Sequence, residues 1–245
     1  MSWDIWINSY QQYLRIEKSL SIHTIDAYKR DIKKLGQYFT SIETPKNPKD
    51  IQYEDFMGFL AQLHQEKISA RSQSRIISSI KSFYKFLFLE KEITTNPSDL
   101  IESPKIGKKL PEFLTIDEID LLIQSIDRSK KEGERNLAML EVLYGCGLRV
   151  SELIDLKISE IYWKEGFIRI IGKGNKERLV PLGKIASKHL KIYIQEVRVH
   201  QKNIKEEFID HVFINKNGTK LSRVMIFKII KSLKQKSGIN KNVSP

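Results

Sequence analysis

Two basic residues of the chain occupy backbone settings that suit contact with an anion. Arg149 follows a glycine-rich turn and begins a predicted helix, where the helix dipole disfavours a positive charge. An anionic partner is therefore expected beside it. Lys173 lies between two glycines at the predicted tip of a hairpin, where the backbone can approach a ligand closely and the ammonium can reach a phosphate or a base edge.

Both settings also have purely structural explanations. Arg149 has Glu152 and Asp155 within two turns of the same helix, and an ion pair with either would satisfy it. A Gly-Lys-Gly sequence is common in exposed hairpin loops. It is not part of a Walker loop, because the pattern Gly-x-x-x-x-Gly-Lys-Ser/Thr is absent. Position alone therefore leaves ligand binding and structural pairing open for both residues.

A third feature is a stripe of cations and hydroxyls on one predicted helix. Its members are spaced four, three, four and three residues apart and therefore share one face; they are Arg71, Arg75, Ser78, Ser82 and Lys85. Such a stripe can follow a phosphate backbone. Any solvated helix face also carries charges, so the spacing alone does not separate the two interpretations.

The first part of the chain, residues 1–103, is predicted to form a domain of four helices. Apolar residues recur every three to four positions, with Ser21 as the expected N-cap of the second helix. The third helix should begin near Tyr53, and the fourth should span Ala70 to Glu90. Residues 104–112 combine prolines, a glycine and lysines, which predicts a basic interdomain linker.

The second part, residues 113–245, is predicted to add more helices and a small β-hairpin. Thr115 and Glu118 have capping-box spacing before one helix. The segments Phe167 to Ile171 and Arg178 to Leu182 are β-branched or aromatic and flank a glycine-rich turn, which is typical of a hairpin. The fold class is thus mainly α with a small β-hairpin or sheet. The remaining predicted elements are helices Gly133 to Leu143, Leu148 to Leu156, Ile185 to Val199 and Ser222 to Lys236, and a strand His211 to Ile214.

Composition restricts the partners. Nearly all of the net charge of +12 belongs to residues 104–245, and no acidic residue follows Lys216. Such an asymmetric field attracts polyanions, either DNA or, as a competing interpretation, RNA. No run of about 18 apolar residues suggests a membrane partner. The single Cys146 allows no internal disulfide and no zinc site is evident, so we expect a cytoplasmic protein without a metal.

Two long segments of the chain resemble a known family. The sequence LYGCGLRVSEL from Leu143 to Leu153, followed by IIGKGNKERLVPL from Ile170 to Leu182, is similar to the Xer-type tyrosine recombinases of the phage integrase family. The front of the chain also matches, and the resemblance covers essentially all of it. The matching residues there are Leu20, Ser21, Thr24, Ala27, Tyr28, Asp31, Ser78, Phe83, Tyr84, Leu87, Asn96 and Pro97, then Leu110, Pro111 and Thr115.

The resemblance implies a helical, SAM-like core-binding domain and an α/β catalytic domain that clamp double-stranded DNA. A tyrosine attacks a DNA phosphate, giving a 3′-phosphotyrosyl link and a free 5′-hydroxyl, without any cofactor. The family acts as a homo- or hetero-tetramer, so a second recombinase subunit is an implied partner. Arg149 would stabilise the transition-state charge at phosphorus, and Lys173 would protonate the leaving oxygen. The implied DNA-binding residues are Arg71, Arg75, Lys81, Lys85, Lys176 and Arg178.

The printed sequence ends before the His-x-x-Arg motif and the nucleophilic tyrosine of that family. We therefore expect a truncated catalytic domain that binds DNA without cutting it. Tyr144, Tyr162 and Tyr193 are expected to be poor substitutes, because the segments around them look like core. Without the missing helices, the apolar face that carries Ile226, Ile229, Ile230 and Leu233 is expected to be exposed and prone to aggregation.

Three functions remain open at this point. The first is site-specific recombination, with chromosome dimer resolution as the expected role and integration of a mobile element as its variant. The second is a non-catalytic DNA-binding accessory protein or regulator. The third, an RNA-binding protein, depends on charge alone. Preference for structured RNA over duplex DNA would distinguish the third from the others.

Overall fold

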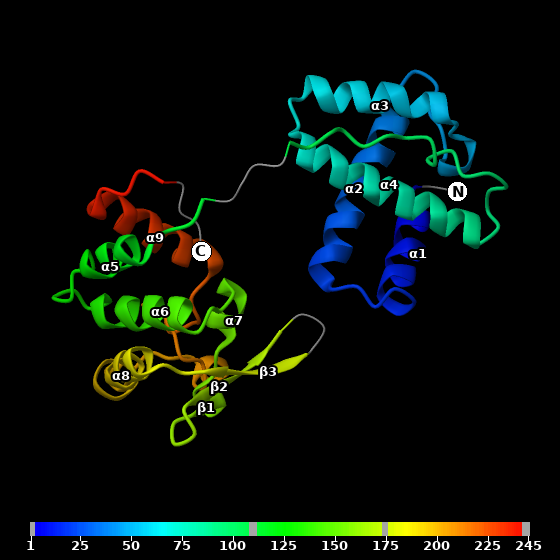
Figure 1. The fold of residues 1–245 in the computed structure, drawn as a ribbon. Helices are drawn as coiled ribbons and strands as arrows, with labels where there is room; N and C mark the ends of the chain where they lie inside the picture. The colour runs from blue at the N-terminus through cyan, green and yellow to red at the C-terminus, as the bar shows by residue number, and fades with distance from the viewer. Residues whose placement is uncertain (1–2, 108–111, 173–175, 242–245) are drawn as a thin grey trace. The chain divides into compact units, whose positions relative to one another are not determined.

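The computed structural model describes residues 3–107, 112–172 and 176–241. The chain divides into two compact units, Met1–Lys109 and Leu110–Pro245 (Figure 1). Each unit has its own hydrophobic core. Most of the described chain is helical, and the second unit adds one small sheet. The predicted fold class, mainly α with a small sheet, is confirmed.

The first unit contains four α-helices around an aromatic core. Ser21 and Ser69 cap the second and fourth helices, and each side chain accepts a hydrogen bond from a backbone N–H of the first turn. One face of every helix is buried, and α4 contributes Ile80, Phe83 and Leu87 to the core, as its spacing predicts. The helices are α1 (Trp3–Ile16), α2 (Ile22–Ser41), α3 (Tyr53–Gln65) and α4 (Ala70–Leu89), with a short 3-10 turn at Pro48–Asp50.

The second unit begins with three helices, and the candidate catalytic arginine, Arg149, precedes the third of them. The capping box between Thr115 and Glu118 starts the first of them, as predicted. The second helix ends in a turn in which Gly147 has a φ of 58°, a left-handed conformation that glycine adopts without strain. The three are α5 (Ile116–Gln124), α6 (Gly133–Gly145) and α7 (Val150–Asp155).

A three-stranded antiparallel sheet follows α7. Strand β2 (Phe167–Ile171) pairs with β3 (Glu177–Pro181), with Ile171 opposite Glu177, and this pair is the predicted hairpin. Strand β1 (Ile161–Tyr162) was not predicted, because a strand of two residues is too short to show an alternation of apolar and polar residues. The predicted strand His211 to Ile214 is wrong: the structure has only isolated bridges there, one to Lys157 and one to Lys220.

The chain then returns to helices. The predicted helix Ile185 to Val199 is divided into α8 (Lys184–Ile192), a π-turn at Tyr193–Val197 and a 3-10 turn at Arg198–His200. A further 3-10 turn, Glu206–Phe208, precedes α9 (Arg223–Ser237), which Ser222 caps.

The expected exposure of one apolar face of α9 is wrong. Ile226, Ile230 and Leu233 are buried in the core of the second unit, and Ile229 is partly buried, because α9 packs on α5 and α7. The apolar side chains that α9 exposes are instead Val224, Met225 and Phe227.

Candidate DNA interface and catalytic arginine

The cationic stripe lies on the solvent side of α4. Arg71, Arg75, Ser78 and Lys85 are exposed, and Ser82 is partly exposed, since the opposite side of the helix fills the core. Within the described part of the chain, Arg71 and Lys85 form no ion pair, which leaves both charges available to a polyanion. Lys81, also predicted to bind DNA, donates a hydrogen bond from Nζ to the carbonyl of Asp99, 3.2 Å away.

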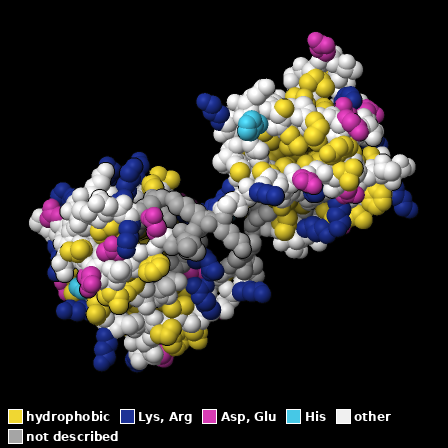
Figure 2. All heavy atoms as spheres, turned by 45° about the horizontal axis from the view of Figure 1, so that its top comes forward, with side chains coloured by type: hydrophobic (Ala, Val, Ile, Leu, Met, Phe, Trp, Pro, Cys, Tyr) yellow, Lys and Arg dark blue, Asp and Glu magenta, His cyan; other side chains and the backbone are white. Residues whose placement is uncertain are grey.

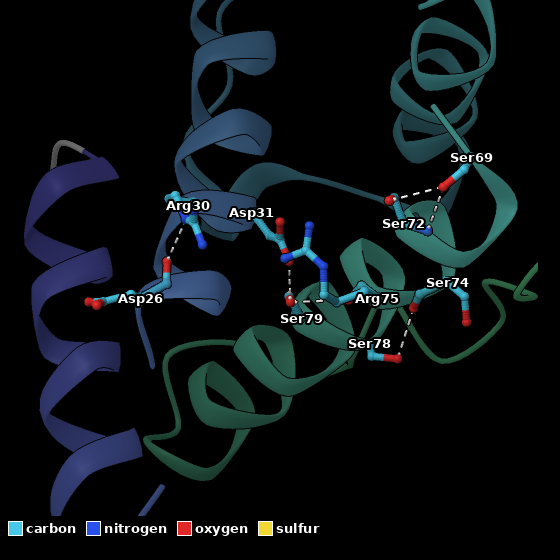
Figure 3. Close-up of polar contacts among 9 residues, drawn as sticks. All are labelled: Asp26, Arg30, Asp31, Ser69, Ser72, Ser74, Arg75, Ser78 and Ser79. Carbon is cyan, nitrogen blue, oxygen red and sulfur yellow. Dashed lines mark hydrogen bonds and ion pairs between the residues drawn. The ribbon is translucent and has the colours of Figure 1, made fainter. Parts of the chain in front are cut away.

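Arg75 differs from its neighbours in the stripe because it is held by a buried carboxylate. Its Nη1 donates to Oδ2 of Asp31 on α2 at 2.7 Å, and the hydroxyl of Ser79 donates to the same oxygen at 2.8 Å (Figure 3). Asp31 is 5% exposed, whereas the Arg75 side chain is 45% exposed. The pair therefore fixes the guanidinium at the surface while the carboxylate stays inside.

Burial has a measurable consequence for Asp31. It raises the pKa of this carboxyl above its ordinary value, because desolvation outweighs the stabilisation by Ser79 and Arg75. In the sequence, Asp31 is only one of the residues that match the family, and its pairing with Arg75 was not predicted.

Arg149 is the N-cap residue of α7. Its backbone N–H donates to Oε2 of Glu152 at 2.8 Å, and its Nη1 donates to Oε1 at 2.9 Å. The expected anionic partner is therefore Glu152, whereas Asp155 pairs with Lys220. The Arg149 side chain is nevertheless 73% exposed. It is tethered at one nitrogen and still presents its other donors to solvent.

A second arginine shares the same carboxylate. Arg178 on β3 donates from Nη1 and Nη2 to Oε1 and Oε2 of Glu152, at 2.6 and 2.8 Å. The two arginines together lower the pKa of Glu152 to about 2, with the Arg178 hydrogen bonds as the largest cause. This carboxylate, only 4% exposed, thus joins the start of α7 to the hairpin.

The hairpin leads from this cluster towards the predicted catalytic lysine. Gly172 is the last described residue before position 173, and a Cβ added there would lie 3.7 Å from Oε1 of Glu152. Lys173 itself lies outside the described residues. Lys176, on the other side of the turn, is exposed, and its carbonyl accepts a hydrogen bond from the N–H of Gly172 at 2.8 Å.

The tyrosines considered as substitute nucleophiles lie in different environments. Tyr193 is 2% exposed and its hydroxyl accepts the N–H of Ile214, while Tyr162 stacks on Phe167. Tyr144 is itself 50% exposed, although the segments beside it, with Val142 and Cys146, belong to the core of the second unit as expected. Its place at the C-terminal end of α6 turns its side chain outward.

The described residues were also searched for a reactive thiol, a metal site and a membrane-spanning helix. Burial raises the pKa of the Cys146 thiol to about 11, which keeps it protonated and unreactive. No group of three or more His, Cys, Asp or Glu residues suited to a metal ion occurs in residues 3–107, 112–172 and 176–241. The same residues include no helix long and apolar enough to span a membrane.

Charged side chains are scattered over the surface that the space-filling view presents (Figure 2). Figure 2 shows Lys and Arg side chains spread over the visible faces of both units, with acidic and apolar side chains between them. The excess of basic groups belongs mainly to the second part of the sequence.

Solved structures with the same fold belong to DNA-rearranging enzymes. The chain aligns over its whole length with 82% of a lambda integrase dimer subunit bound to a COC′ core site, at a TM-score of 0.73 and 19% identity. It aligns over 97% of its length with 70% of the XerH site-specific recombinase bound to difH, at a TM-score of 0.69 and 19% identity. These similarities show that the chain shares the fold of these two DNA-bound proteins.

Sequence comparison establishes the family. Residues 7–91 match the N-terminal SAM-like domain of phage integrases, and residues 112–245 match the phage integrase family itself. The chain is 42% identical over 241 residues to the tyrosine recombinase XerD of Oceanobacillus iheyensis, and 39% identical over 239 residues to that of Listeria innocua. Each alignment covers 98% of this chain and 80% of the relative. The chain belongs to the phage integrase family, among the Xer-type tyrosine recombinases.

Proposed function

We propose that this protein acts in site-specific DNA recombination, and that Arg149 contacts the phosphate at which the strand is cut. The observation that carries the proposal is the geometry of Arg149. Its guanidinium is fixed at one nitrogen by the buried Glu152, and its side chain is 73% exposed. A fixed cation with free donors suits the extra negative charge of a phosphoryl transition state.

Within this proposal, Lys173 is the general acid for the leaving 5′-oxygen, and residues 1–103 form a DNA-binding domain that a linker at 104–112 joins to the catalytic domain at 113–245. Arg71, Arg75, Lys81 and Lys85 of the first domain and Lys176 of the hairpin contact the DNA backbone. The functional assembly is a homo- or hetero-tetramer on duplex DNA, in the cytoplasm. The resemblance to the Xer-type enzymes favours chromosome dimer resolution over integration of a mobile element.

A recombination assay in cells tests this function. A plasmid with two copies of a duplex site, selected from random sequence by binding to the protein, is expected to lose the intervening segment when the native gene is expressed. Arg149→Ala should abolish the loss, while Arg128→Ala, which changes an exposed arginine paired with Glu134, should leave it intact. Loss of the segment with Arg149→Ala would refute the assigned role.

We also propose that the printed 245 residues bind duplex DNA without forming a covalent link to it. Of the three tyrosines considered, Tyr193 is buried and Tyr162 is stacked, which leaves Tyr144 as the accessible one. If the proposal holds, a nicked suicide duplex gives no protein-DNA adduct on a denaturing gel, even though Tyr144 is accessible. An adduct that disappears in Tyr144→Phe would contradict this proposal and identify the nucleophile.

A non-catalytic DNA-binding regulator is the second candidate. It is favoured by the same surface of α4, which requires no chemistry. The two candidates agree on duplex binding and differ in the plasmid assay, where a regulator leaves both copies of the site in place.

A further inference from the structure

A cavity of about 410 Å³ opens in the second unit beside the start of α6. Arg149 lies beyond the other end of this helix. A helix of 13 residues is about 20 Å long, so the cavity and the candidate catalytic arginine are well separated. Its lining includes Lys131, Glu132, Arg135, Tyr193, Lys202 and Lys216.

The central group of this cavity is a buried cation without an anionic partner. Arg135 is 8% exposed and donates only to neutral oxygens: the carbonyl of Ile214 at 3.1 Å and Oδ1 of Asn136 at 3.0 and 3.2 Å. No carboxylate of the described residues lies within ion-pair distance of it. Charged side chains are rarely buried unless they are paired, and burial lowers the pKa of this guanidinium.

The position of Arg135 in its helix strengthens the argument. It lies in the first turn of α6, where the aligned peptide dipoles already produce a positive potential. An anion placed here would therefore be stabilised by the helix and by the guanidinium together. The phenol of Tyr193 adds a further buried donor, since its oxygen accepts the N–H of Ile214 and the described residues offer its proton no acceptor.

The rim of the cavity is also cationic. Lys131, Lys202 and Lys216 are exposed, and none of them forms an ion pair with any residue that the structure describes. Glu132 is the one carboxylate of the lining. Four cations facing one acid favour a ligand with more than one negative charge.

We propose that this cavity binds a small phosphate-bearing ligand, with Arg135 as the buried anchor and Lys131, Lys202 and Lys216 at the rim. Guanidinium groups bind phosphate oxygens through paired hydrogen bonds, and lysines add point charges. The volume is within the range of small-molecule sites and exceeds what a single phosphate fills. The site is independent of the proposed recombination function, because it shares no residue with the α4 stripe or with the Arg149 cluster.

A calorimetric titration with inorganic pyrophosphate tests the proposal, with potassium chloride at equal ionic strength as reference. We expect saturable binding to the wild-type protein and a melting temperature that rises with pyrophosphate concentration. The variant Lys202→Ala/Lys216→Ala changes only exposed rim residues and should bind about tenfold more weakly. The matched variant Lys164→Ala/Lys188→Ala, at two exposed lysines outside the cavity lining, should bind like the wild type.

Three results would overturn the proposal. The first is a response to pyrophosphate no larger than that to potassium chloride. The second is equal weakening in both double variants, which would indicate general charge attraction. The third is displacement of pyrophosphate by a short DNA duplex together with weaker duplex binding by Lys202→Ala/Lys216→Ala, which would assign the cavity to the DNA backbone. If Arg135 only holds the Ile214 carbonyl, Arg135→Met will lower stability while the wild type shows no response to pyrophosphate.

Discussion

Arg178 and Glu152 are 26 residues apart in the sequence and meet through two parallel hydrogen bonds of 2.6 and 2.8 Å. This bidentate pair connects strand β3 to helix α7, whose N-cap is Arg149. Because Glu152 also holds the backbone N–H and the guanidinium of Arg149, the position of the candidate catalytic arginine depends on a residue of the hairpin.

The depressed pKa of Glu152 predicts how stability depends on acidity. A carboxyl whose pKa is about 2 in the folded protein, against 4.5 ordinarily, stabilises the fold fully above pH 4.5 and progressively loses this contribution as the pH falls towards 2. Urea unfolding followed by circular dichroism should show this loss for the wild type. Glu152→Gln should be less stable at pH 7 and lose less on acidification, whereas Glu165→Gln, an exposed control, should follow the wild type. Parallel pH profiles for all three proteins would contradict the assignment.

Arg178 was predicted to bind DNA, and the pair with Glu152 predicts a different main effect. Arg178→Ala leaves a buried carboxylate with Arg149 as its remaining partner, so we expect a loss of about 1 to 3 kcal/mol of unfolding free energy. The salt dependence of duplex binding should stay unchanged, since no phosphate contact is lost. A decrease of about one in the salt slope without a stability loss would instead identify Arg178 as a DNA contact.

Asp31 predicts the opposite pH behaviour from Glu152. Its pKa is raised above the ordinary 3.8 by burial, so its contribution to stability is greatest when it is protonated and decreases as the pH rises through the raised value. Asp31→Asn keeps the shape and removes the titration. The free energy of unfolding of the wild type minus that of Asp31→Asn should decrease as the pH rises above 3.8. A flat difference would show that burial does not raise the pKa of Asp31, and a difference that rises with pH would show that the pair with Arg75 outweighs burial.

The packing of α9 predicts a contrast between two neighbouring residues. Ile226 is fully buried, so Ile226→Ala should cost about 2 to 5 kcal/mol through the cavity it leaves. Phe227 is 46% exposed, so Phe227→Ser should change stability by less than about 0.5 kcal/mol and reduce association of the protein. Thermal melts and light scattering measure both effects. Equal destabilisation by the two changes would contradict the assignment of Ile226 to the buried face of α9 and of Phe227 to its exposed face.

Features that depend on neighbouring residues could be predicted from the sequence, whereas contacts between distant residues could not. The caps at Ser21 and Thr115 and the left-handed Gly147 follow from residues within one turn, and the sequence predicts them. The burial of Asp31 was not predicted, although its helical spacing from Tyr28 and Leu35 places it on the packed side of α2. An acidic residue there signals a buried partner.

The contacts between residues far apart in the chain could not be predicted from the sequence in the same way. Helical periodicity identified the apolar face of α9 but could not show that α5 and α7 cover it. The pair of Arg178 with Glu152 likewise depends on how the hairpin packs on α7, which no local pattern encodes. From the sequence, a basic residue such as Arg178 could contact DNA or form an ion pair. The ion pair with Glu152 is seen only in the tertiary structure.

The most direct test of the central claim is the affinity for duplex DNA as a function of salt, measured by fluorescence anisotropy. We predict duplex binding that weakens steeply with salt, a slope reduced by about two in Arg71→Ala/Lys85→Ala, and no reduction in Lys33→Ala, an exposed control on α2. Three results would contradict the account. They are an affinity that does not depend on salt, a salt slope that is the same in Arg71→Ala/Lys85→Ala as in the wild type, and stronger binding to structured RNA than to duplex DNA.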